Sequence, residues 1–171
     1  TWLREVTRVS VATPDPDDVE AGFAAPIRRL AEHVAIGETV RHAARDAVRD
    51  IETGAWSPRW VLAHNDLWMG NFLNAAPSSR ERYVVIDWGG SELRGHAIYD
   101  LVRVAMSLRV SKRRFAAEVQ AHCGTLGCQP AQAQHHLIGA LARLGENLGE
   151  WPEAKFVELA NLTLDYLGAV R

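Results

Sequence analysis

The sequence lacks the features that mark secreted, membrane-spanning and nucleic-acid-binding proteins. It holds only two cysteines, Cys123 and Cys128, and one pair five positions apart does not make the disulfide framework expected of a small secreted domain. No apolar run approaches the roughly 20 residues that a membrane-spanning helix needs, and a net charge of -2 gives no electrostatic footprint for nucleic acid. We therefore expect a cytoplasmic protein with reduced thiols that binds neither nucleic acid nor a membrane.

Clustered glycines and lysines are also missing from the first part of the chain. Ahead of residue 64 the glycines are Gly22, Gly37 and Gly54, which are too far apart for a glycine-rich loop. The lysines of the whole chain are Lys112 and Lys155, both downstream of that point. Residues 1–63 therefore do not supply a phosphate-binding loop with its lysine.

What remains is an ordinary globular composition with 47% apolar and 23% charged residues. A chain of 171 residues can bury roughly 70% of the surface that its unfolded form exposes. No internal repeat or low-complexity segment divides the sequence. We expect one domain over residues 1–171.

The periodicity of apolar residues predicts an α+β fold that is predominantly helical. Residues 1–17, with two prolines and an acidic cluster, are predicted to be irregular. A polar turn at 75–82 is expected to join two of the strands into a small hairpin. The predicted helices are 24–35, 38–51, 98–108, 115–122, 130–148 and 153–170, and the predicted strands are 60–63, 71–74 and 83–86.

Three polar side chains stand at the ends of these strands. Asp66 lies in the run HNDLWMGN at 64–71, which ends on Asn71, and Asp87 follows the strand in the run VVIDWG. An H-x-D-x-x-x-x-N run followed by an aspartate at a strand end matches the template of phosphoryl-transfer enzymes. In that template the first aspartate accepts the proton of the attacking hydroxyl, while the asparagine and the second aspartate hold magnesium.

These runs, followed by Gly95-His96-Ala97-Ile98-Tyr99-Asp100-Leu101, resemble the aminoglycoside phosphotransferase and choline kinase family. Asn65 stands where that family commonly has glycine. The resemblance covers roughly the whole chain and implies the C-terminal lobe of a protein-kinase-like fold, with ATP and magnesium as cofactors. It places the catalytic base on Asp66, the metal ligands on Asn71 and Asp87, and a helix-borne aspartate on Asp100.

Two further residues are expected to support the catalytic loop. His64 is assigned to packing and hydrogen bonding, because in the template the residue that accepts the proton of the attacking hydroxyl is the aspartate at the position of Asp66. Asp100 has two interpretations: an acid that complements the dipole of its helix, or, by the family resemblance, an anchor that accepts hydrogen bonds from backbone amides of the catalytic loop. The anchor is favoured.

A kinase also needs an N-terminal lobe that covers the nucleotide. Because the glycine-rich loop and the lysine are absent, we expect the chain to be one lobe of a longer parent protein. The parent is expected to transfer the γ-phosphate of ATP to a hydroxyl of a small molecule such as a sugar, an amino alcohol or an aminoglycoside. The isolated chain is expected to be inactive, with the missing lobe as its partner.

Two other classes of function remain open. A pseudokinase-like lobe would keep the fold and use it to bind or regulate a partner. A metal-dependent hydrolase would use Asp66, Asn71 and Asp87 to activate water, but it would need more metal ligands than the sequence offers.

Overall fold

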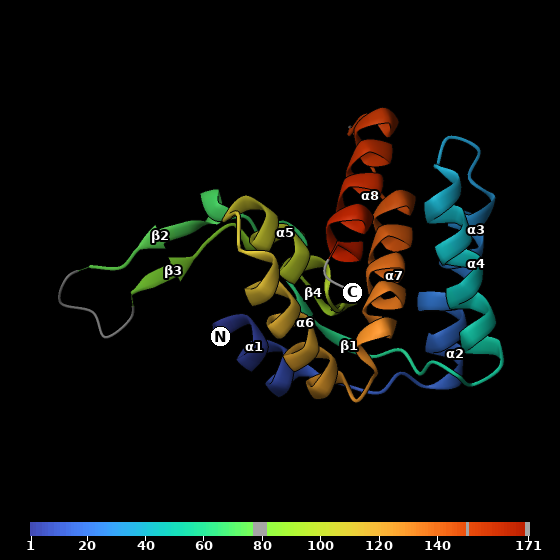
Figure 1. The fold of residues 1–171 in the computed structure, drawn as a ribbon, viewed down its shortest axis with the longest axis horizontal. Helices are drawn as coiled ribbons and strands as arrows, with labels where there is room; N and C mark the ends of the chain where they lie inside the picture. Colours follow the sequence, from blue (N-terminus) through green and yellow to red (C-terminus); the bar gives the residue numbers. More distant parts are fainter. Residues whose placement is uncertain (77–81, 150, 170–171) are drawn as a thin grey trace.

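The computed structural model describes residues 1–76, 82–149 and 151–169 (Figure 1). The described strands all lie in the middle of the chain, between Trp60 and His96. The α-helices are α1 (Trp2–Ser10), α2 (Pro16–Val19), α3 (Ala25–Glu32), α4 (Glu38–Glu52), α5 (Tyr99–Ser107), α6 (Lys112–Leu126), α7 (Ala133–Glu146) and α8 (Glu153–Gly168). The strands are β1 (Trp60–Ala63), β2 (Phe72–Asn74), β3 (Tyr83–Val85) and β4 (Glu92–His96), and the short helices are η1 (Glu20–Ala24), η2 (Met69–Asn71), η3 (Trp88–Gly90) and η4 (Pro130–Gln132). Helices α1–α4 precede the strands and helices α5–α8 follow them.

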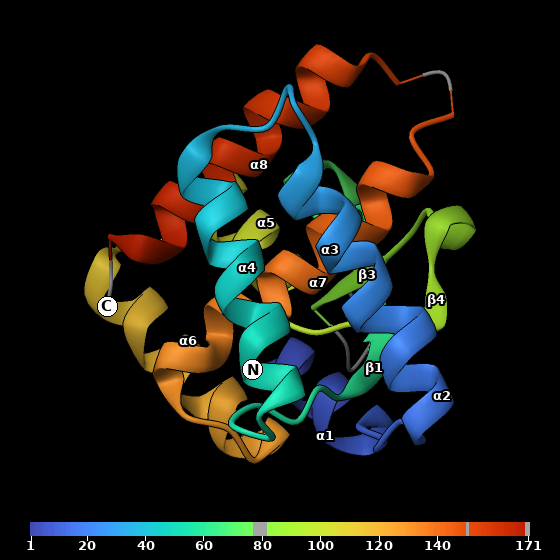
Figure 2. The same cartoon turned by 90° about the vertical axis from the view of Figure 1, so that its right-hand side faces the viewer.

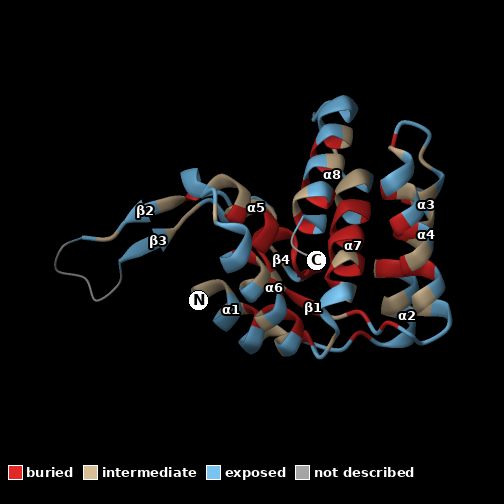
Figure 3. Ribbon diagram, in the orientation of Figure 1, coloured by how far each residue is buried: buried red, intermediate tan, exposed pale blue. Residues whose placement is uncertain are grey.

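Helix α7 is the centre of the helical part. It contacts α3, α4, α5 and α8, and Figure 2 shows α3 and α4 covering it. Its residues from His135 to Ala142 are buried, which fits an apolar helix surrounded by others (Figure 3). The hydrophobic core therefore lies around α7, and the β2–β3 hairpin projects away from it (Figure 1).

The four described strands form two antiparallel pairs. Strand β1 pairs with β4, with Trp60 opposite His96 and Ala63 opposite Glu92, and the register is irregular between Val61 and Ala63. Strand β2 pairs with β3 in the predicted hairpin. The irregularity has the effect of a β-bulge, which redirects the strand at the point where the chain leaves toward His64.

One prediction on secondary structure is wrong, and one predicted helix is present but longer than expected. Residues 2–10 form α1 and are not irregular, because the helix packs on α6 and β1 and so gains tertiary contacts that local sequence does not reveal. Helix α6 runs from Lys112 to Leu126 and is longer than the predicted 115–122. Strand β4 was not predicted at all. The turn predicted at 75–82 lies mostly outside the described residues.

The predicted α+β, predominantly helical fold class is confirmed. Within the described ranges, no helix combines the length and the apolar character that crossing a membrane requires.

The stability of this fold is expected to fall in mild acid because of His96. The ring is buried against Phe23 and Trp60, with ring centroids 4.7 and 5.2 Å away. Burial, with smaller contributions from His136 and Arg143, lowers the pKa of His96 to about 3. The unfolded chain binds a proton near pH 6.5, so this contribution to stability is complete above that pH and is lost as the pH falls toward 3. Urea denaturation should give a free energy of unfolding about 2 kcal/mol lower at pH 5 than at pH 7 from this group.

The control for this prediction is His42, whose side chain is 71% exposed. His96→Gln should flatten the dependence of stability on pH between 7 and 5, and His42→Gln should leave it unchanged. An unaltered slope in the His96 variant would show that another group controls the acid sensitivity.

Candidate functional site

The run 64–71, which carries the candidate catalytic residues and is called the catalytic run, begins where β1 ends. Gly95 in β4 allows the close approach of the two strands here, because a Cβ at Gly95 would lie 2.4 Å from the Cβ of Ala63. Asn65 follows with a φ of 65°, in the left-handed region. Glycine and asparagine are the residues that enter this region most easily, which explains how asparagine serves at this position. The chain then turns through η2 into β2.

Asn71 is hydrogen-bonded to Asp66. Its Nδ2 donates to the backbone oxygen of Asp66 at 2.8 Å and to Oδ2 of the same residue at 3.2 Å. Asn71 is buried, whereas the side chain of Asp66 is 56% exposed. Because the amide nitrogen faces Asp66, the amide oxygen of Asn71 is the atom left to bind another group.

His64 connects the catalytic run to the segment that carries Asp87. Its Nε2 lies 2.9 Å from the backbone oxygen of Ile86, and its Nδ1 accepts from the backbone N–H of Asp66 at 3.4 Å. Its ring also lies 4.7 Å from that of Trp88. These contacts reach the residues on both sides of Asp87, so the buried ring of His64 holds the two segments together.

The backbone fixes the direction in which Asp87 leaves the hairpin. The N–H of Ile86 donates to the backbone oxygen of Asn71 at 3.0 Å, and Nδ2 of Asn65 donates to the oxygen of Gly90 at 2.9 Å. Asp87 itself has a φ of 61°. A left-handed aspartate is uncommon and is seen most often at functional sites and turns. Asp87 is an exposed residue, and Ile86 before it is hydrogen-bonded to the run 64–71.

Asp100 lies beneath the catalytic run, in the first turn of α5. Its Oδ2 accepts from the backbone N–H of His64 at 2.6 Å and its Oδ1 from that of Asn65 at 3.0 Å. Burial raises the pKa of this carboxyl group, and the N–H donors of His64, Asn65 and Leu67 oppose that effect by favouring the charged form. The carboxylate of Asp100 therefore supplies the hydrogen bonds that water would otherwise make to the backbone N–H groups of His64 and Asn65.

Arg103 joins the site from the same helix. Its Nη2 lies 3.7 Å from Oδ1 of Asp66, the oxygen that does not face Asn71. Its Nε is buried and has no hydrogen-bond partner within the described part of the chain. Tyr99, one turn earlier, is buried, and burial raises the pKa of its hydroxyl to about 12, with Arg103 opposing the shift. The guanidinium therefore lies beside Asp66 and near the hydroxyl of Tyr99.

Arg103 is not among the residues predicted from the sequence. Its spacing of three residues from Asp100 places both on one face of α5, and since Asp100 was expected to face the catalytic run, that spacing could have identified it. The structure brings His64, Asp66, Asn71 and Asp100 into one hydrogen-bonded group and places Asp87 next to it.

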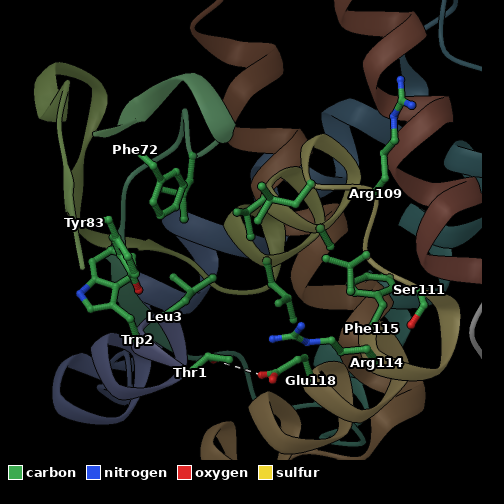
Figure 4. Close-up of a pocket in the computed structure, with 16 residues that line it drawn as sticks. Thr1, Trp2, Leu3, Phe72, Tyr83, Arg109, Ser111, Arg114, Phe115 and Glu118 are labelled. Atoms are coloured by element: carbon green, nitrogen blue, oxygen red, sulfur yellow. Dashed lines mark hydrogen bonds between the residues drawn. The ribbon is translucent and has the colours of Figure 1, made fainter. Parts of the chain in front are cut away.

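An apolar cavity of about 650 Å³ borders the same loop (Figure 4). It lies between α1, the β2–β3 hairpin, α5 and α6, and Leu67 and Phe72 from the catalytic segment contribute to its wall. At its lower edge in the close-up, the hydroxyl of Thr1 donates to Glu118 at 3.1 Å. The carboxylates of Asp66, Asp87 and Asp100 do not line this cavity, whereas Leu67 from the same run does. The run 64–71 therefore carries polar motif residues and also contributes an apolar residue to the cavity wall.

Comparison with known proteins identifies a family but no individual relative. Neither the curated proteins nor the solved structures gave a match to this chain. A model of the phosphotransferase enzyme family matches residues 3–137, which is most of the chain and includes every motif residue described above. The predicted resemblance is therefore confirmed, and the chain belongs to the phosphotransferase enzyme family.

Proposed function

We propose that this chain is the catalytic lobe of an ATP-dependent phosphotransferase that phosphorylates a hydroxyl group of a small molecule. The observation that carries the proposal is the hydrogen bonding of Asn71 to Asp66, which ties together two residues of the phosphoryl-transfer template and orients both. In such reactions the protein does little covalent chemistry, and rate acceleration comes from positioning and from stabilisation of charge.

Asp66 is proposed as the catalytic base. Its carboxylate is more than half exposed, so a hydroxyl group can reach it, while Asn71 holds Oδ2 and Arg103 lies beside Oδ1. Asp66 then orients the acceptor hydroxyl and takes its proton as the bond to phosphorus forms. His64 serves as support, because its ring nitrogens are occupied by Ile86 and Asp66.

The donor set fits magnesium, which prefers oxygen ligands and is commonly held by one or two carboxylates together with substrate phosphates. The amide oxygen of Asn71 and the carboxylate of Asp87 are proposed as its protein ligands. The described residues contain no group of three His, Cys, Asp or Glu side chains that could hold a metal by themselves, which suits a metal shared with phosphate groups. When bound, magnesium neutralises charge on the phosphates.

The nucleotide-covering lobe is proposed to come from elsewhere in a parent protein, since residues 1–63 hold no glycine-rich loop and no lysine. On this proposal residues 1–171 act as a single domain. The 171-residue chain alone should bind ATP weakly, because half of the cleft is missing. Calorimetry with ATP and magnesium should detect no tight binding, and tight binding would contradict the assignment to one lobe.

The acceptor is proposed to be a sugar, an amino alcohol or an aminoglycoside, and the site of action the cytoplasm, where ATP and reduced thiols occur together. The test is a screen of the full-length protein against these three acceptor classes with ATP and magnesium. Formation of a phosphorylated acceptor supports the proposal. Partner binding without transfer to any acceptor would instead favour a pseudokinase-like module.

Arg103 is proposed as a positioning residue for Asp66. Arg103→Met in the full-length protein should lower kcat by about 10- to 100-fold, the cost expected when a reacting group loses its geometry, and should leave the KM for ATP nearly unchanged. Arg103→Lys should recover part of the loss. Arg41 is the matched control, because its side chain is 31% exposed and its Nε is likewise buried without a partner among the described residues. Equal kcat values for the Arg103→Met and Arg41→Met variants would contradict the role.

A further inference from the structure

The second feature with its own chemistry is a pair of thiols at the end of α6, outside the phosphotransfer site. The helix ends on Gly127, which has a φ of 71°. The N–H of Gly127 bonds to the oxygen of Gly124 at 3.4 Å, and the N–H of Cys128 bonds to the oxygen of Cys123 at 3.0 Å. This pair of bonds defines a Schellman motif, in which the side chains of the first and last residues are frequently in contact.

In this chain both positions of that contact hold cysteine. The two thiols lie close enough to alter each other's pKa, and both cysteines are free. Cys123 is completely buried, whereas Cys128 is partly exposed at the edge of the core. The motif thus places the buried thiol of Cys123 behind the partly exposed thiol of Cys128.

The surroundings shift the pKa values of the two thiols in opposite directions. The hydrogen bond from Cys123 lowers the pKa of Cys128, and His136 and Arg59 add to the effect. The hydrogen bond to Cys128 and burial both raise the pKa of Cys123. A thiol that is exposed and readily ionised, next to a second thiol that can resolve it, is the arrangement found in oxidation-sensitive cysteine pairs.

We propose that Cys123 and Cys128 form an oxidation site at which hydrogen peroxide produces an intramolecular disulfide. The Cys128 thiolate attacks one peroxide oxygen, the O–O bond breaks, and the released hydroxide takes up a proton to become water. The sulfur of Cys123 then attacks the resulting sulfenic acid and displaces its hydroxyl group, which leaves as water with the Cys123 proton. Two thiols are oxidised by two electrons in total, and one peroxide is reduced to two waters.

This proposal is independent of the phosphotransferase activity. The two thiols lie at the corner between α6 and η4, and His136 belongs to α7. None of these elements carries a motif residue of the catalytic site. The 171-residue chain alone is therefore a valid sample for the test.

The experiment treats the folded chain with a small excess of hydrogen peroxide, quenches it and counts the free thiols after denaturation. We expect the loss of both thiols, an intact mass lower by two hydrogen atoms, no covalent dimer, and full recovery with a dithiol reductant. Cys123→Ser should stop at a sulfenic acid that dimedone traps on Cys128. Cys128→Ser should retain its remaining thiol.

Three results would overturn the proposal. They are two remaining thiols in the treated native chain, a covalent dimer as the main product, or oxidation of Cys128→Ser as fast as that of the native chain. Circular dichroism of each variant establishes that it is folded, and Cys128→Ala replaces Cys128→Ser if the serine variant is not.

Discussion

Replacing Asp66 by asparagine in the full-length protein is expected to lower kcat by about 10²- to 10⁴-fold, the range found when a general base is removed. Asparagine has nearly the same shape and keeps an oxygen that can accept the hydrogen bond from Nδ2 of Asn71. The loss should therefore come from the missing proton acceptor and not from a rearranged loop. Steady-state kinetics at saturating ATP and acceptor measures it.

The same substitution should leave the fold intact. The side chain of Asp66 is 56% exposed, and surface substitutions usually change stability by less than about 0.5 kcal/mol. Asp165→Asn, at an exposed position on α8, serves as the control for loss of a carboxylate elsewhere. If the Asp66→Asn variant turned over as fast as the Asp165→Asn variant, Asp66 would not be the catalytic base.

Asp100→Asn is expected to have the second large effect, and it can be measured on the isolated chain. The carboxylate accepts from the amides of His64 and Asn65 through its two oxygens, whereas an asparagine amide offers one oxygen and places an NH₂ group against the other donor. A buried donor left without an acceptor costs about 1–3 kcal/mol. The free energy of unfolding, measured with urea, should fall by that amount.

The matched control is Asp46, an acid on α4 whose side chain is 27% exposed and which pairs with Arg49. Asp46→Asn should change stability by less than about 0.5 kcal/mol, since exposed ion pairs contribute little. If the two variants unfold at the same urea concentration, Asp100 is not an anchor of the loop. In the full-length protein, Asp100→Asn should also reduce kcat, because the loop that carries Asp66 would be less well positioned.

Features that depend on local periodicity could be predicted from the sequence. The strand at Trp60–Ala63 and the hairpin strands are runs of apolar and aromatic residues, and α4 shows apolar residues at helical spacing. The order of the motif residues could be read directly, because phosphoryl transfer requires those residue types at those spacings.

Features that depend on tertiary contacts could not be predicted. Strand β4 has the sequence ELRGH, which is largely polar and shows no alternation, and it is a strand because it pairs with β1. Arg103 has no motif of its own. Its spacing from Asp100 indicates which face of α5 it occupies, but its approach to Asp66 depends on how that helix packs against the run 64–71. The left-handed conformations of Asn65 and Asp87 are likewise set by the bonds between their two segments.

The most direct test of the central claim measures two products in one reaction of the full-length protein with ATP, magnesium and an acceptor. The proposed roles of Asp66, Asn71 and Asp87 predict one phosphorylated acceptor for each ADP formed, and loss of both products in the Asp66→Asn variant. ADP accompanied by free phosphate, with no phosphorylated acceptor, would contradict the account and favour a metal-dependent hydrolase.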